Sequence, residues 1–226
     1  MTAGLCSRSL VGACVVALFL LPGKRARADE VVEVLSLGVR HELVKDLDLS
    51  GGVQLRLDEG FSRVERWLPE AAIEYRLVKP LMLGAGYRLS YARNSRGEFD
   101  LAHRVHVQAG LGFKLKPMGA KLKYRLRLQD RFERNEGEPT EHQPTLRNAL
   151  ELSYTDWQLL KPFISAEHYL ALDELVEEPT RRWKFILGVQ HDWGPVGLEL
   201  YYRLDLRVAN DDPNRHMIGL GMRLEL

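Results

Sequence analysis

Apolar and polar residues alternate with a period of two along most of this sequence, in stretches of about 12 residues. Between residues 121 and 132, for example, leucine, tyrosine and phenylalanine alternate with lysine, arginine and glutamine. Successive side chains of a β-strand point to opposite faces, so each stretch would form a strand with one apolar and one charged face. Eleven such stretches are present, at residues 32–43, 47–58, 63–77, 80–92, 99–115, 120–133, 144–155, 162–173, 181–193, 196–208 and 215–226.

Two kinds of connection alternate between these stretches. Turn signals mark the tight connections near residues 44–46, 78–80, 116–119 and 194–196, and longer polar connections lie at 93–98, 134–143, 174–181 and 209–214. Each stretch exceeds the roughly 9–11 residues that a tilted strand needs to cross a bilayer. Short turns at one end and longer loops at the other are typical of outer-membrane barrels. The sequence therefore predicts an all-β fold, a closed antiparallel transmembrane β-barrel, with residues 29–226 as its single domain.

The overall composition conceals this arrangement. The chain has 226 residues, 32 Lys+Arg against 31 Asp+Glu, and a mean hydropathy of −0.25, as many soluble proteins do. Such values also arise when a charged face and an apolar face average out along each strand. After residue 23 no apolar run approaches the roughly 20 residues of a membrane-spanning helix, which excludes a helical membrane protein. The balanced charge provides no basic excess for a nucleic-acid partner.

The first 28 residues have the features of a secretory signal peptide. Residues 10–21 form an apolar run of 12 residues after Arg8, and Ala26-Arg27-Ala28 supplies an A-x-A cleavage site. We therefore expect export and a location in the cell outer membrane. Cleavage would remove four basic residues and both cysteines, Cys6 and Cys14, and leave 198 residues with 28 Lys+Arg and 31 Asp+Glu, a formal charge of −3. No cofactor and no metal are expected, because the mature chain has no thiol and no His/Asp/Glu set with convincing ligand spacing.

Parity limits the number of strands. Bacterial single-chain barrels have an even number, with both chain ends in the periplasm. Eleven stretches would place the two ends on opposite sides of the membrane. We therefore expect about 12 strands if one has escaped notice, or 10 if one stretch does not span. The stretch at residues 32–43 alternates least clearly.

Aromatic residues on the apolar face gather near the ends of the stretches. With the tight turns taken as periplasmic, one set lies near the outer rim and a second set near the inner rim. The two sets are Trp67, Tyr91, Phe99, Phe132 and Trp183, and then Tyr75, Phe113 and Trp193. Indole and phenol rings favour the membrane–water interface, so these residues are predicted to form two aromatic girdles.

The charged faces are predicted to point into the lumen. One strand carries a basic stripe, composed of Lys121, Lys123, Arg125, Arg127 and Arg131. The inward faces of other strands carry a wider charge network, composed of Arg56, Arg88, Arg104, Arg147, Glu151, Glu167, Lys184 and Arg203. Two interpretations are open: Arg–carboxylate pairs that fill a small barrel, or a narrow, porin-like channel whose basic stripe attracts small anionic solutes.

Several phrases resemble a family of bacterial outer-membrane β-barrels catalogued as a domain of unknown function. They occur in order along nearly the whole mature chain. Among them are Tyr124-Arg125-Leu126-Arg127-Leu128-Gln129-Asp130-Arg131-Phe132, Leu146-Arg147-Asn148 and Lys161-Pro162-Phe163-Ile164-Ser165-Ala166-Glu167. The resemblance implies an outer-membrane barrel without an assigned activity, and it supplies no catalytic residues.

Other functional classes remain open alongside a structural or pore-like barrel. A barrel enzyme acting on lipid is suggested by Glu167-His168-Tyr169-Leu170, although leucine stands where such an enzyme would have its serine. Asp211-Asp212 with His216 is the nearest counterpart of a proteolytic site, but we find no complete catalytic constellation. A soluble periplasmic β-rich binding module is the second alternative. The partners expected for the barrel are outer-membrane lipid, lipopolysaccharide and, during insertion, the barrel assembly machinery.

Overall fold

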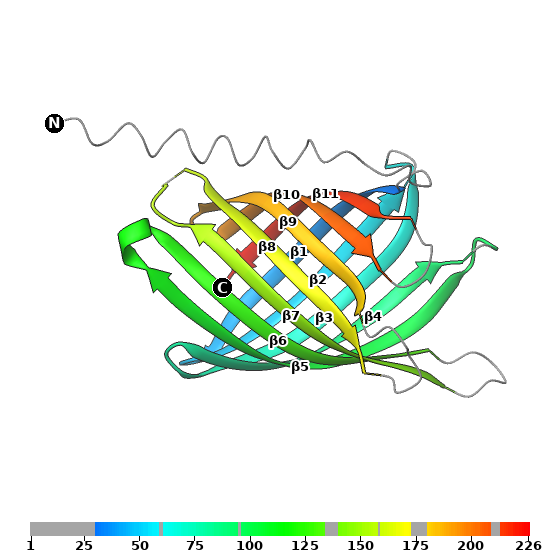
Figure 1. The fold of residues 1–226 in the computed structure, drawn as a ribbon, viewed down its shortest axis with the longest axis horizontal. Coiled ribbons are helices and arrows are strands. Elements are labelled where there is room, and N and C mark those ends of the chain that lie inside the picture. The colour runs from blue at the N-terminus through cyan, green and yellow to red at the C-terminus, as the bar shows by residue number, and fades with distance from the viewer. Residues whose placement is uncertain are drawn as a thin grey trace.

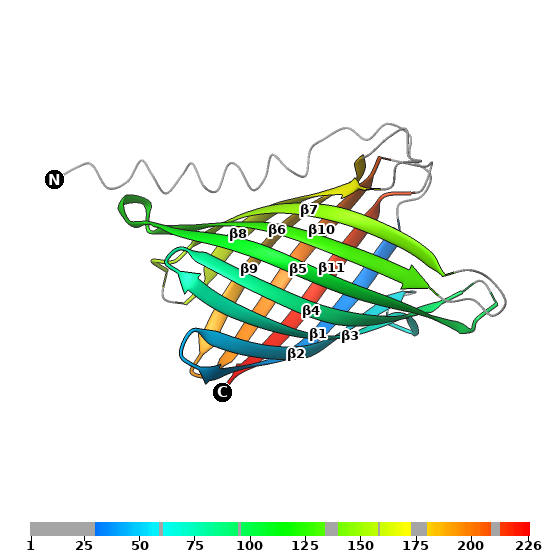
Figure 2. The same cartoon turned by 90° about the horizontal axis from the view of Figure 1, so that it is seen from below.

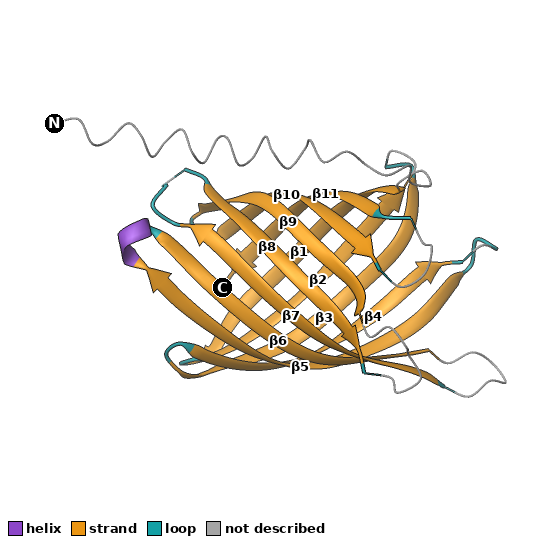
Figure 3. Ribbon diagram, in the orientation of Figure 1, coloured by secondary structure: helices purple, strands orange, loops and turns teal. Residues whose placement is uncertain are grey.

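The computed structural model describes residues 30–58, 61–94, 96–133, 140–157, 159–172, 180–208 and 213–226, so the predicted signal peptide lies outside the described residues. Eleven strands follow one another, and the only helical segment described is a 3-10 turn at Lys116–Met118 (Figure 3). The strands are β1 (Glu30–Val44), β2 (Leu47–Asp58), β3 (Arg63–Val78), β4 (Leu81–Arg93), β5 (Phe99–Leu115), β6 (Ala120–Glu133), β7 (Glu141–Tyr154), β8 (Lys161–Ala171), β9 (Thr180–Trp193), β10 (Val196–Arg207) and β11 (Arg215–Glu225). No helix among these residues is long and apolar enough to span a membrane.

The strands form one closed barrel (Figures 1 and 2). Neighbours in sequence pair antiparallel, and β1 closes the ring by pairing with β11 in parallel, from Glu30↔Arg215 to Arg40↔Glu225. The predicted closed all-β barrel is therefore confirmed, and its eleven described strands are close to the predicted number of about 12, although the number is odd and not even as parity predicted. The stretch that alternates least clearly is a full strand of 15 residues, β1, with partners on both sides. A parallel seam satisfies the backbone of both edge strands, so closure needs no twelfth strand.

The two ends of the barrel differ in their connections, as the sequence predicts. Tight turns join β1 to β2, β3 to β4, β5 to β6 and β9 to β10, at the left of Figure 1. Left-handed backbone at Asp46, Gly119 and Gly194 makes three of these turns. At Gly119 the left-handed φ of 58° disfavours a residue with a Cβ atom, and such an atom would overlap the Asp156 carboxylate unless that side chain moved. We call this the short-turn end and the opposite one the long-loop end.

The alternation of the sequence becomes an outer apolar surface and a mostly polar interior. Large apolar side chains such as Leu37, Val107, Leu128 and Leu200 are exposed on the outside. All eight candidate girdle residues also belong to strands and alternate in register with these outward side chains: Trp67, Tyr75, Tyr91, Phe99, Phe113, Phe132, Trp183 and Trp193. Trp67 stacks on Tyr91 with ring centroids 5.5 Å apart.

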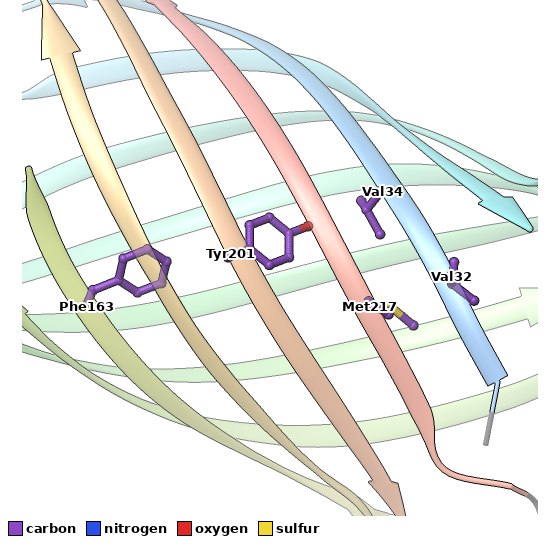
Figure 4. Packing of buried hydrophobic residues seen from close by; sticks show 5 residues of the cluster. All are labelled: Val32, Val34, Phe163, Tyr201 and Met217. Carbon is purple, nitrogen blue, oxygen red and sulfur yellow. The ribbon is translucent and has the colours of Figure 1, made fainter. Parts of the chain in front are cut away.

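Part of the interior is apolar, which the sequence analysis did not anticipate. Five buried residues from β1, β8, β10 and β11 form one cluster on a single wall of the barrel: Val32, Val34, Phe163, Tyr201 and Met217 (Figure 4). Inward glycines make room for the rings. Phe163 faces Gly188 and Tyr201 faces Gly219 across the strand pairs, and in each case a Cβ atom on the glycine would overlap the ring.

Candidate functional site

The most highly connected group inside the barrel is the carboxylate of Glu167 on β8. Its Oε1 accepts hydrogen bonds from Arg147 at 2.6 Å and from Arg125 at 3.0 Å. Its Oε2 accepts bonds from the Lys184 ammonium at 2.8 Å and from the Tyr169 hydroxyl at 2.7 Å. Glu167, Arg147 and Lys184 are only 3%, 7% and 8% exposed. We call these five residues the Glu167 hub.

The register of the sheet places this hub. Directly opposed inward positions run across β6 to β11 and on to β1 in the order Arg125, Ala149, Glu167, Lys184, Asp205, Arg215 and Glu30. The charged members of this row alternate in sign. Opposite charges that face each other across neighbouring strands attract, so the row favours this register over a slipped one.

Tyr169 joins the hub to a second ion pair. Its ring lies 4.6 Å from the Arg147 guanidinium, 4.0 Å from that of Arg182 and 4.8 Å from the Lys184 ammonium. A buried ring face attracts cations through its quadrupole. Arg182 also approaches Asp205 at 3.7 Å, and Asp205 binds Arg203 at 3.0 Å. The Tyr169 ring thus contacts cations from two ion-paired groups, one around Glu167 and one around Asp205.

The basic stripe of β6 is engaged by neighbouring strands over most of its length. Lys123 pairs with Glu151 at 2.7 Å, and Arg125 belongs to the Glu167 hub. Arg127 donates two bonds to Gln108, at 2.6 and 2.9 Å. Arg131 contacts Glu133 and donates to Gln143. Lys121, the remaining member, lies on the same inward face close to the short-turn end.

The rest of the predicted charge network is spread over both halves of the lumen. Arg88 pairs with Glu70, and Arg203 pairs with Asp205 and contacts the Met217 sulfur. Arg56 has only a 3.4 Å bond to Gln54, and Arg104 has no described partner. The sequence places these side chains on the inward face, but the structure joins only Arg147, Glu167 and Lys184 of this set in one hub.

Buried side chains continue from the hub around the barrel. Ten of the eleven described strands contribute an inward residue that is less than about a tenth exposed; β2 contributes the half-buried Arg56 instead. Examples on the wall opposite the hub are Leu68 on β3, Ser90 on β4 and His106 on β5. We call this layer of packed side chains the septum.

The short-turn half of the lumen is more open than the septum. Two adjoining cavities, of about 350 and 210 Å³, share Ser36, Gly38 and Arg223 in their linings. Small inward residues of β1, β2 and β11 leave this space. The Glu70–Arg88 pair lines the larger cavity on the side of the septum.

The structure brings together no catalytic set from the candidate enzyme motifs. His168 does not point into the lumen with Glu167; it stacks on Trp183 at 4.2 Å and lies 3.2 Å from the Thr180 hydroxyl. Asp211 and Asp212 lie outside the described residues, and His216 contacts the Tyr202 hydroxyl. Within the described ranges, no group of three or more His, Cys, Asp or Glu residues is placed to hold a metal ion.

Sequence reasoning missed three polar residues of this interior, Tyr169, Gln108 and Gln129. Gln108 links Arg127 to Glu74, and Gln129 accepts a bond from Arg147 at 3.0 Å. One signal was present: Tyr169 lies two residues after Glu167 and therefore shares its face. Nothing in the sequence indicates which neighbouring strand supplies their partners.

Comparisons with known proteins agree with this architecture. The model of a family described as a protein of unknown function, DUF2490, matches residues 35–224. A search of the curated proteins found no match. Among solved structures, LpxR from Salmonella typhimurium has a TM-score of 0.51 and 10% sequence identity over 79% of this chain and 83% of its own. The β-domain of the Bordetella autotransporter BrkA has a TM-score of 0.43 and 11% identity over 77% and 82%. LpxR is an outer-membrane β-barrel, and at this identity its similarity to this chain concerns the fold alone.

Proposed function

This chain belongs to the DUF2490 family of proteins of unknown function, and we propose that it is a structural outer-membrane β-barrel whose lumen is closed to ion flow. The proposal assigns no reaction to the barrel. It chooses between the two interpretations of the charged interior, an ion-paired filling and an anion-attracting channel.

The observation that carries the proposal is the buried state of the septum. An open aqueous pore keeps its lining side chains hydrated. In contrast, Glu167, Tyr169 and Lys184 are almost inaccessible to solvent, and their polar atoms bind one another. The apolar cluster around Met217 adds a further dry section. Hydrated ions would have to displace both to pass.

Planar-bilayer conductance tests this proposal directly. The wild-type barrel is expected to insert without a steady ionic current. Alanine replacement of Arg147, Glu167, Tyr169 and Lys184 together should produce a measurable current, because it removes the centre of the septum. Heat-modifiable migration on gels would first establish that the variant is folded.

The alternative of a narrow anion channel makes the opposite prediction. It requires steady wild-type conductance with a preference for anions, which Arg125→Glu together with Arg127→Glu would reverse. That result would overturn the closed-lumen proposal.

The proposed location rests on the outer surface. An apolar exterior bordered by aromatic side chains matches a bilayer and its interfaces, and lipopolysaccharide and outer-membrane lipid are the partners that would cover it. Insertion by the barrel assembly machinery belongs to the same proposal. Fractionation of cells should recover the protein with the outer membrane, whereas a purely soluble periplasmic pool would contradict it.

A further inference from the structure

Several arginines in the long-loop half of the lumen face one another without a carboxylate between them. Arg56 on β2 is directly opposite Arg66 on β3. Arg104 on β5 is directly opposite Arg88 on β4 and Arg131 on β6. Like charges in directly opposed positions of a sheet repel each other and destabilise the pair. In the Glu167 hub, by contrast, all three cations contact the Glu167 carboxylate.

The acids close to these arginines are already engaged by other cations. Glu70 pairs with Arg88, Glu133 pairs with Arg131, and Glu65 binds Arg215 at 2.8 Å. Arg56 and Arg66 lie within electrostatic range of Glu65, which Arg215 already binds, and no ion pair is described for Arg66 or Arg104. The Nε atoms of Arg56, Arg66 and Arg104 are inaccessible to solvent and have no hydrogen-bond partner among the described residues.

Two further arginines border both sets, the pair Arg56 and Arg66 and the position of Arg104. Arg131 and Arg182 lie within electrostatic range of both Arg66 and Arg104. Their side chains remain 25% and 32% exposed, so solvent reaches this part of the lumen. Partly desolvated guanidinium groups that outnumber the acids beside them are costly, and a bound anion would offset that cost.

We propose that Arg56, Arg66 and Arg104, with Arg131 and Arg182 beside them, form a binding site for a phosphate monoester or inorganic phosphate dianion. A dianion supplies two negative charges in one small group. The planar fork of arginine matches the oxygens of phosphate and binds them through paired N–H donors. This site goes beyond the structural role proposed above, and it does not depend on whether the septum conducts ions.

The site is tested on the full-length barrel in a neutral detergent. Isothermal titration with inorganic phosphate, at an ionic strength held constant with chloride, should give saturable binding to the wild type. Arg104→Gln is expected to weaken this affinity at least tenfold. Arg223→Gln is the matched control, because Arg223 is a lumenal arginine of the short-turn half that already pairs with Glu225 at 3.2 Å; its phosphate affinity should equal that of the wild type.

A stability measurement keeps the proposal testable if Arg104→Gln binds poorly for another reason. In phosphate-free buffer Arg104→Gln should unfold at a urea concentration no lower than the wild type, since a repulsive charge has been removed. Phosphate should raise the midpoint of the wild type and leave that of the variant unchanged. Equal stabilisation of both proteins by phosphate would overturn the proposal, as would the absence of any effect beyond that of chloride.

Two sources of the phosphate group are distinguished by a second titration, with phosphatidic acid in mixed micelles. Arg104-dependent binding that is tighter for phosphatidic acid than for inorganic phosphate supports a lipid headgroup as the ligand. Tighter binding of inorganic phosphate supports a small soluble phosphate compound. Binding of either probe that Arg104→Gln and Arg66→Gln both leave unchanged contradicts the site.

Discussion

The Glu167 carboxylate binds three cations at once. Loss of Glu167 would leave all three cations without this partner, whereas loss of one cation would leave Glu167 with the other two. Replacing a buried ion pair as a whole with apolar groups is often tolerated, whereas removing one partner leaves an uncompensated charge. Within the hub Glu167 is the only acid, and it also accepts the Tyr169 hydroxyl bond. We therefore expect substitution of Glu167 to have the largest effect within the hub.

Glu167→Gln should destabilise the folded barrel by about 3–5 kcal/mol, the usual cost of breaking a buried pair from one side. The free energy of unfolding can be measured by urea titration in detergent, with tryptophan fluorescence as the signal. Glu151→Gln is the control, because Glu151 pairs with Lys123, whose side chain is 45% exposed. Its effect should stay below about 1 kcal/mol. Equal losses of unfolding free energy in the two variants would show that the Glu167 hub contributes no more to stability than the exposed Glu151–Lys123 pair.

Tyr169 makes two separable contributions, one through its hydroxyl and one through its ring. Tyr169→Phe removes the 2.7 Å bond to Glu167 and the bond that the hydroxyl accepts from Lys184, but it keeps the ring, so we expect a loss of about 1 kcal/mol. Tyr169→Leu also removes the ring face that contacts Arg147, Arg182 and Lys184, and should cost about 2 kcal/mol more. The same unfolding measurement distinguishes them; equal effects would mean that the cation–π contacts contribute nothing.

For individual residues, the sequence predicted which side chains point into the lumen better than it predicted which side chains pair with one another. Alternation alone placed Arg147, Glu167 and Lys184 inside, and all three are inside and buried. It did not reveal the apolar cluster, because Val32, Val34 and Met217 occupy the inward face of strands that also have apolar outward residues. Where both faces are apolar, a period of two carries no information about which one meets lipid.

At the scale of strands, several buried rings each face a glycine on the neighbouring strand. Tyr201 on β10 and Gly219 on β11 are directly opposed, and so are Phe163 with Gly188 and His106 with Gly86. In each pair a Cβ atom on the glycine would overlap the ring. The missing side chain lets a large ring lie flat against the neighbouring strand, which packs the septum without widening the barrel.

Gly219→Ala should therefore destabilise the barrel by about 1–3 kcal/mol through overpacking against Tyr201. Gly112→Ala serves as the control, since a Cβ atom there meets only the Lys121 side chain, at 3.9 Å. Alanine at that strand position should be neutral or slightly stabilising. The measurement is the urea midpoint of unfolding of the two variants and the wild type. An unchanged midpoint for Gly219→Ala would refute the packing argument.

The bounds of the strands were the most predictable part of the molecule. Ten of the eleven stretches match their strands to within two residues at each end, and β7 begins three residues earlier than expected. This accuracy follows from the physics of the pattern, because each strand has to present an apolar outer face along its whole length. Among the described residues only the 3-10 turn at Lys116–Met118 departs from strand and turn, and Pro117 and Gly119 marked that position in the sequence.

Closure belongs to the whole molecule, and there alternation predicted a closed barrel but not the number of strands that close it. Alternation specifies each strand but not which strands are neighbours, so the strand number had to be inferred from parity. The structure instead joins β1 and β11 along eleven directly opposed residue pairs. Arg215 supports this seam by contacting Glu30 on β1 and Glu65 on β3, and the Leu226 N–H donates to the Arg40 carbonyl at 2.8 Å.

A cysteine pair across the seam tests this closure. In a background in which Cys6 and Cys14 are replaced by serine, Ser36→Cys with Gly221→Cys should form a disulfide on mild oxidation. Ser36 and Gly221 are directly opposed, and a Cβ atom at 221 would lie 2.9 Å from the Ser36 hydroxyl. A strand inserted between β1 and β11 would separate the two positions by about 10 Å, beyond the roughly 4.4–6.8 Å that a disulfide allows between Cα atoms.

Two companion variants make the result unambiguous. Ser36→Cys with Gln54→Cys joins β1 to β2 at another directly opposed pair and should cross-link whatever the closure. Ser36→Cys with Arg223→Cys lies two residues out of register and should cross-link more slowly. Loss of free thiols in the folded protein is the measurement. A parallel eleven-strand seam requires the 36–221 pair to react as completely as the 36–54 pair; an unreactive 36–221 pair beside a reactive 36–54 pair would mean that β1 and β11 are not neighbours.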